Sequence, residues 1–133
     1  GADMVTSITT PAVTASSAPR QANMRERSTI KGDRMIVCIP REVDHCFADD
    51  VRELVDRRLQ VENIKVLEFN FQTTEFMDSS GVGMIISRYK ETTLLGGSVC
   101  VAGAAPIIER LFYVSGLHKI IRMYPEVEAV FHE

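Results

Sequence analysis

The sequence predicts an α/β protein in which amphipathic helices pack against a mixed, mostly parallel sheet of four to five strands. After two initial strand-like runs, helix-like and strand-like segments alternate along the chain. Such alternation is typical of parallel strands joined by right-handed crossovers. Each of the three main helical segments also carries a single apolar stripe, as expected for a helix that packs on a sheet.

Composition predicts one soluble globular domain, because 45% of the 133 residues are hydrophobic and 25% are charged. A net charge of −3 and a pI near 5.6 give no support for a basic nucleic-acid-binding surface, so we expect no direct contact with nucleic acid. No apolar run approaches the length of a membrane span, and no signal-peptide pattern opens the chain. We therefore expect a cytoplasmic protein without membrane association.

Residues 1–28 are rich in Ser, Thr and Pro and poor in large apolar side chains. Such a composition predicts a disordered tail, and Gly1-Ala2-Asp3 is typical of a cloning remnant. The folded domain is expected at 29–133.

Cys38, Cys46 and Cys100 are odd in number and form no C-x-x-C pair, so neither a disulfide framework nor a zinc site is predicted. Cys38 and Cys100 lie in apolar strand-like runs and are expected in the core. No cofactor is expected.

The first half of the domain is predicted to be a hairpin followed by a helix. Apolar runs at Ile30 and 35–39 flank the turn signal Lys31-Gly32-Asp33, and Pro40 should end regular pairing because it has no N–H to donate. A helical apolar face follows, made by Phe47, Val51, Leu54, Val55 and Leu59. Asp44 precedes it as a candidate N-cap worth about 1 kcal/mol.

The second half continues with a buried strand at 64–71 and a helix at 82–95 that ends at Gly96-Gly97. We assign Val82, Ile85, Ile86, Tyr89 and Thr93 to the apolar side of this helix, and Arg88, Lys90 and Glu91 to its polar side. A strand at 98–103, a helix from Pro106 to Gly116 and a short strand at 120–124 follow. Pro125 could open a terminal helix with Val127, Val130 and Phe131.

The predicted elements are arranged to present the segment Phe76-Met77-Asp78-Ser79-Ser80-Gly81-Val82-Gly83. Ser79 and Ser80 fall at the turn between a strand and a helix, where free backbone N–H groups and the helix dipole favour an anion. Asp78 opposes a second negative charge. A serine placed here can carry a switchable charge. Val82 and Gly83 are expected to contact a partner. Val82 could equally belong to the core.

A serine hydrolase is the main enzymatic alternative. The nucleophile elbow needs glycine two residues on either side of the serine, and neither Ser79 nor Ser80 has this pattern. Of the three histidines, only His45, beside Asp44, could approach the turn, and we interpret it as a surface or partner-contact residue. The 81–86 segment lacks the third glycine of a dinucleotide fingerprint, and no Gly-Lys-Ser/Thr occurs.

The segment 76–83, together with Arg88-Tyr89-Lys90, Gly96-Gly97, Arg110-Leu111-Phe112 and 115–122, resembles the bacterial anti-sigma factor antagonists of the STAS domain family, particularly those of sporulation. The similarity covers about residues 24–130. It implies a STAS-like fold and a non-enzymatic partner switch. The unphosphorylated antagonist binds an anti-sigma factor that is also a serine kinase and thereby releases the sigma factor. Phosphorylation breaks the complex, and a serine phosphatase resets it.

By motif position the resemblance implies Ser79 as the phosphorylated residue, although spacing alone does not separate Ser79 from Ser80. Asp44 matches an acid of the family near the acceptor, and Pro40-Arg41 stands where the family commonly has glycine. The partner-binding residues are expected to be Asp44, His45, Asp78, Ser79, Ser80, Gly81, Val82 and Gly83. A STAS scaffold in another signalling assembly remains an alternative, and we expect a monomer or weak dimer.

Overall fold

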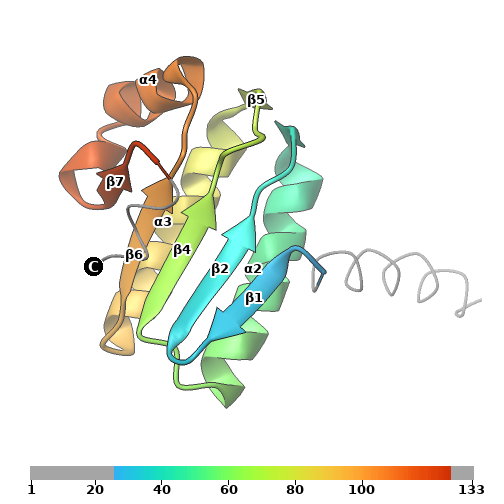
Figure 1. The fold of residues 1–133 in the computed structure, drawn as a ribbon, viewed down its shortest axis with the longest axis vertical. Helices are drawn as coiled ribbons and strands as arrows, with labels where there is room; N and C mark the ends of the chain where they lie inside the picture. Colours follow the sequence, from blue (N-terminus) through green and yellow to red (C-terminus); the bar gives the residue numbers. More distant parts are fainter. Residues whose placement is uncertain (1–25, 127–133) are drawn as a thin grey trace, which may run out of the picture.

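The computed structural model describes residues 26–126 and has a five-stranded sheet with the order β1-β2-β4-β6-β7 (Figure 1). Only β1 runs antiparallel to its neighbour, and the other pairings are parallel. The strands are β1 (Ser28–Lys31), β2 (Arg34–Cys38), β4 (Val66–Asn70), β6 (Ser98–Ala102) and β7 (Arg122–Tyr124). The predicted α/β class with a mixed, mostly parallel sheet is confirmed.

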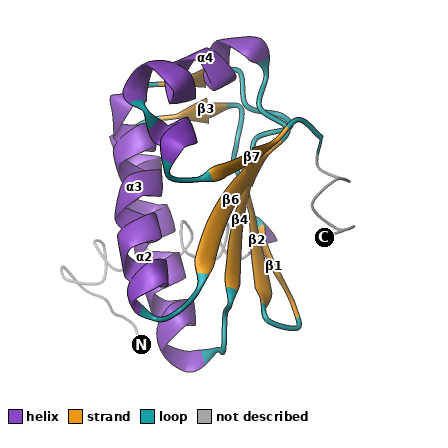
Figure 2. Ribbon diagram, turned by 90° about the vertical axis from the view of Figure 1, so that its left-hand side faces the viewer, coloured by secondary structure: helices purple, strands orange, loops and turns teal. Residues whose placement is uncertain are grey.

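The helices gather on one face of the sheet (Figure 2). Helix α2 (His45–Val61) and helix α3 (Ser79–Leu94) lie side by side there, and α4 (Pro106–Ser115) crosses near the end of the sheet where α3 begins. A short 3-10 helix, η1 (Leu117–Lys119), leads into β7. The helix-facing side chains of the strands, including Phe69 and Val101, are almost fully buried in one core with Leu54, Ile85 and Phe112.

A second, very small sheet lies beyond the end of β2 and β4. It consists of β3 (Glu42–Val43) and β5 (Phe76–Met77), which pair in parallel. These strands are not predictable from the sequence, because two residues are too few to show a period. This small sheet determines where α2 and α3 begin.

Several predicted boundaries agree with the structure. Strand β2 ends at Cys38, two residues before Pro40, and Asp44 and Gly116 stand at the ends of α2 and α4. Ser28 was assigned to the tail but already belongs to β1. The rest of the predicted tail, and the predicted terminal helix with Val127, Val130 and Phe131, lie outside the described residues.

Three side chains differ from the prediction. Arg88 was assigned to the polar side of its helix, but it is only 3% exposed because it lies at the contact between α2 and α3. Thr93 is exposed, and Thr92 is buried in its place. Cys38 and Cys100 both lie on the face of the sheet opposite α2 and α3. Cys38 is exposed there, whereas Cys100 is buried in a small cluster with Ala102, Val66 and Tyr124. Over residues 26–126, no helix is long and apolar enough to cross a membrane.

Candidate functional site

The small sheet brings two helix N-termini together. Glu42 pairs with Phe76 and Val43 with Met77, so the next residues, Asp44 and Asp78, occupy equivalent positions at the starts of α2 and α3. Each aspartate caps its own helix through its carboxylate. Asp44 Oδ1 accepts a hydrogen bond from the Phe47 N–H at 3.0 Å, and Asp78 Oδ1 accepts one from the Ser80 N–H at 2.9 Å. Two acid-capped helix starts therefore form one edge of the molecule.

The loop before β3 is fixed by hydrogen bonds to the segment before β5. The Arg41 carbonyl accepts from the N–H groups of Glu75 and Phe76 at 2.8 and 3.0 Å, and the Thr74 hydroxyl donates to the Pro40 carbonyl at 2.9 Å. Arg41 Nε also donates to Glu75 Oε1 at 2.7 Å. Pro40-Arg41 thus tethers the two helix starts to each other.

The two serines of the turn differ in their surroundings. Ser79 is exposed in the first turn of α3, and within residues 26–126 its hydroxyl has no hydrogen-bond partner. Ser80 is partly buried, and its hydroxyl donates to Asp78 Oδ1. The hydrogen bond from the Ser80 hydroxyl, helped by the Ser80 N–H and by His45, lowers the pKa of Asp78 below its ordinary value. Asp78 is therefore an anion at neutral pH.

The three residues after the serines have different roles. The side chain of Met77 lies against Gly81, where an added Cβ would come within 2.3 Å of Met77 Cγ and Sδ. Val82 is only 6% exposed and belongs to the core, which is one of the two positions that the sequence left open for it. Gly83 lies on the exposed side of α3, with open space above it.

One exposed aromatic residue was missing from the predicted site. Phe76 is 55% exposed although it stands two residues before Asp78. The next residue of β5, Met77, points into the core and is 7% exposed. Because successive side chains of a strand point to opposite faces, Phe76 points away from the core. This alternation was the signal available in the sequence. An exposed aromatic ring beside the serine turn suits a protein contact.

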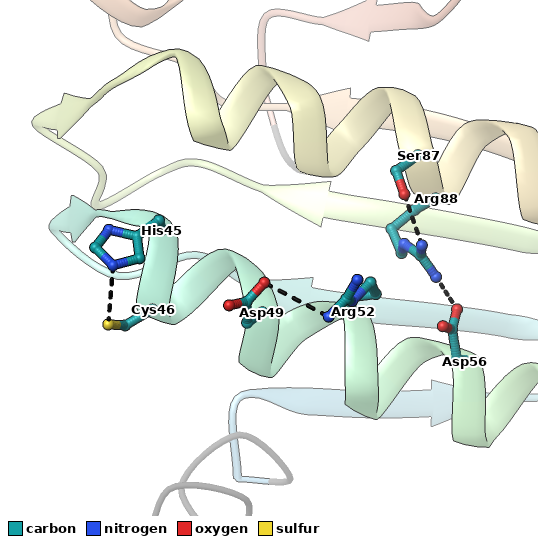
Figure 3. A network of polar contacts seen from close by, with 7 residues as sticks. All are labelled: His45, Cys46, Asp49, Arg52, Asp56, Ser87 and Arg88. Atoms are coloured by element: carbon teal, nitrogen blue, oxygen red, sulfur yellow. Dashed lines mark hydrogen bonds and ion pairs between the residues drawn. The ribbon is translucent and has the colours of Figure 1, made fainter.

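His45 lies at this edge but does not complete a catalytic arrangement. Its Nε2 is 3.6 Å from the sulfur of Cys46, the next residue of α2 (Figure 3). Among the described residues, no hydrogen bond joins His45 to Ser79 or Ser80. The site therefore groups acids, hydroxyls and an exposed ring, and it lacks the serine–histidine contact of a hydrolase.

The family model described as the STAS domain matches residues 21–130. The chain therefore belongs to the STAS domain family. An anti-sigma F factor antagonist from Paenibacillus polymyxa is 37% identical over 97 residues, which cover 72% of this chain and 83% of that protein. Within the family, this chain thus stands with the anti-sigma factor antagonists, as its resemblance to the sporulation proteins predicted.

Two solved structures share the fold. The anti-sigma factor antagonist SpoIIAA in its unphosphorylated form gives a TM-score of 0.68 at 24% identity and covers 77% of this chain and 89% of its own. The Bacillus cell fate determinant SpoIIAA in its phosphorylated form gives 0.64 at 24% identity and covers 78% and 94%. At this level of identity the likeness shows the shared fold alone.

Proposed function

We propose that this protein is an anti-sigma factor antagonist whose binding to an anti-sigma factor is switched off by phosphorylation of Ser79. The main observation in support of this proposal is the position of Ser79. Its hydroxyl is exposed at the first turn of α3, beside a second helix start that bears Asp44. The relationship to anti-sigma factor antagonists supports this function.

The charge change explains how such a switch works. Phosphorylation adds a charge of about −1.5 to −2 to a position that previously offered a neutral hydroxyl. In a complex, the dianion would have to lose water while facing the carboxylates of Asp78 and Asp44. The combined cost is on the order of several kcal/mol, and each 1.4 kcal/mol lowers affinity about tenfold. The phosphate projects from the surface, so the fold itself should remain intact.

The structure favours Ser79 over Ser80 as the acceptor. A kinase needs a hydroxyl that it can reach and deprotonate, and Ser79 supplies one. The Ser80 hydroxyl is held by Asp78 in a partly buried position. Transfer to Ser80 would break that hydrogen bond and place the phosphate against the Asp78 carboxylate.

The implied partners are an anti-sigma factor with serine kinase activity and a serine phosphatase that restores Ser79. The protein acts in the cytoplasm through these protein contacts and has no catalytic step or direct nucleic-acid contact of its own. The proposed contact edge comprises the exposed residues around the two helix starts, namely Asp44, His45, Phe76, Asp78, Ser79 and Gly83, together with the partly buried Ser80.

The test is to incubate the protein with its anti-sigma kinase and ATP and to locate the phosphate by mass spectrometry. Ser79→Ala should bind the kinase and resist phosphorylation, while Ser80→Ala should still be phosphorylated. Ser79→Asp should abolish binding and leave the free energy of unfolding within about 1 kcal/mol of wild type. Phosphate on Ser80 alone, or full binding by Ser79→Asp, would contradict the proposed switch.

A further inference from the structure

A groove runs between α2 and α3 from the serine turn toward the middle of both helices. Its volume is about 210 Å³. It is lined by His45, Ala48, Asp49 and Arg52 from α2 and by Ser80, Gly83, Met84 and Ser87 from α3. Each set has the spacing of one helix face over two turns, about 10 Å of helix. The groove is continuous with the proposed contact edge, because His45 and Ser80 belong to both.

Gly83 in the groove wall is not required by the fold. A Cβ added to Gly83 would meet no heavy atom within 4 Å, and its backbone lies within regular helix without a positive φ. Glycine inside a helix is less stable than alanine. In contrast, an added Cβ at Gly81 would strike Met77. Gly81 therefore serves the packing of the domain, whereas Gly83 leaves room for something outside it.

The wall that α2 forms also has a small side chain, and its ion pair is weak. Ala48 contributes a single methyl group, and the Asp49–Arg52 ion pair is long, at 3.7 Å, with both side chains more than half exposed. Figure 3 shows this pair along the upper side of α2, between His45 and Asp56. A pair of this kind contributes little to stability. Both charges are thus available to a partner.

We infer that the groove between α2 and α3 receives one α-helix of the anti-sigma factor, with a side chain of that helix seated over Gly83. This inference rests on the proposed function and extends its contact surface to Ala48, Arg52 and Ser87. A third helix packs well into the groove between two parallel helices, since the ridge of one helix fits the groove of another. The missing side chain at Gly83 allows the close approach that such packing needs.

The inference predicts opposite effects on stability and binding. Gly83→Ala should raise the Tm of the free protein by about 2–6 °C and yet weaken binding to the anti-sigma factor about tenfold. Gly83→Gln and Ala48→Gln, which fill the groove from either wall, should weaken binding at least about a hundredfold. Thr93→Gln places the same glutamine side chain on α3 outside the groove and should bind within about twofold of wild type. Calorimetric titration and thermal unfolding measure both quantities.

Cross-linking tests whether the occupant is a helix. A Ser87→Cys variant, in a Cys38→Ser and Cys46→Ser background, should capture positions in the anti-sigma factor that recur every three or four residues. Wild-type affinity of both Gly83→Gln and Ala48→Gln would overturn the groove inference and leave the Ser79 switch standing. Weak binding by these variants with full binding by Ser79→Asp would support the groove and overturn the switch. Absence of binding by the wild-type chain would overturn both.

Discussion

Asp78 acts on two neighbours with one carboxylate. Its Oδ1 accepts from both the N–H and the hydroxyl of Ser80, so it caps α3 and fixes the rotamer of Ser80. The same negative charge lies next to Ser79 and opposes a phosphate there. One residue therefore stabilises the helix start and, in the proposed switch, would also make the phosphorylated form unfavourable for binding.

Replacing Asp78 should change the pH dependence of stability. Because hydrogen bonds lower the pKa of Asp78 in the folded state, its stabilising effect is present above the ordinary pKa near 4 and is lost as the pH falls through the lower folded value. Asp78→Ala should lower the Tm by a few degrees at pH 7 and make little difference near pH 2. Asp78→Asn keeps the cap and should lose less.

Thermal unfolding of wild type, Asp78→Ala and Asp78→Asn between pH 2 and pH 7 measures this effect. Asp44→Ala, which removes the equivalent cap of α2, is the matched control for loss of a cap away from the serines. A wild-type advantage over Asp78→Ala that stays constant down to pH 2 would show that ionisation of Asp78 does not contribute.

At the level of the elements, local patterns were enough to predict the helices and long strands. Asp44, Pro106 and Gly116 marked helix ends, and the apolar stripes identified the buried faces. The short strands β3 and β5 were missed, since only long-range pairing defines them. The burial of Arg88 was also missed, because a charged residue is predicted to be exposed unless the neighbouring helix that covers it is known.

Arg88 joins α2 and α3 in an unusual way. Its side chain is 4% exposed. Its guanidinium forms an ion pair with Asp56 and donates to the Ser87 hydroxyl at 2.6 Å (Figure 3). Burial lowers the pKa of Arg88, and its Nε has no partner among the described residues. Asp56 is 42% exposed and can be hydrated alone. Arg88 therefore needs Asp56 as a counter-ion more than Asp56 needs Arg88.

This asymmetry predicts which single change is harmful. Asp56→Ala leaves a buried charge without its carboxylate and should cost about 1–3 kcal/mol, less than a fully buried pair because Asp56 is partly exposed. Arg88→Met keeps an apolar stem and removes the charge, so it should cost less than Asp56→Ala. Adding Arg88→Met to Asp56→Ala should recover most of the loss. Urea unfolding of the three variants measures the energies, and equal losses in both single variants would refute the asymmetry.

For the whole molecule, topology explains why the serine turn and the Asp44 loop meet. Strands β2 and β4 are parallel neighbours, so the segments that leave them emerge at the same end of the sheet, where sites of α/β proteins are commonly found. The sequence motif identified the turn, but its neighbours Phe76, Ala48 and Ser87 became visible only through this arrangement. Because Ser79 is exposed, we expect the proposed change of charge to alter the surface and to leave the sheet unchanged.

Salt dependence separates the two physical causes of the switch. Repulsion between the phosphate and distant acids would be screened as salt rises from 0.01 to 1 M, since the Debye length falls from about 30 to about 3 Å. The cost of removing water from the phosphate is not screened. Because Asp78 adjoins Ser79 and Asp44 caps the neighbouring helix, the repulsion acts at close range inside the contact.

We therefore expect the phosphorylated protein to bind at least about tenfold more weakly than the unphosphorylated protein even at 1 M salt. Titration of both forms against the anti-sigma factor at several salt concentrations measures this ratio, with Ser79→Ala as the control that cannot be charged. Convergence of the two affinities at high salt would instead assign the switch to long-range repulsion.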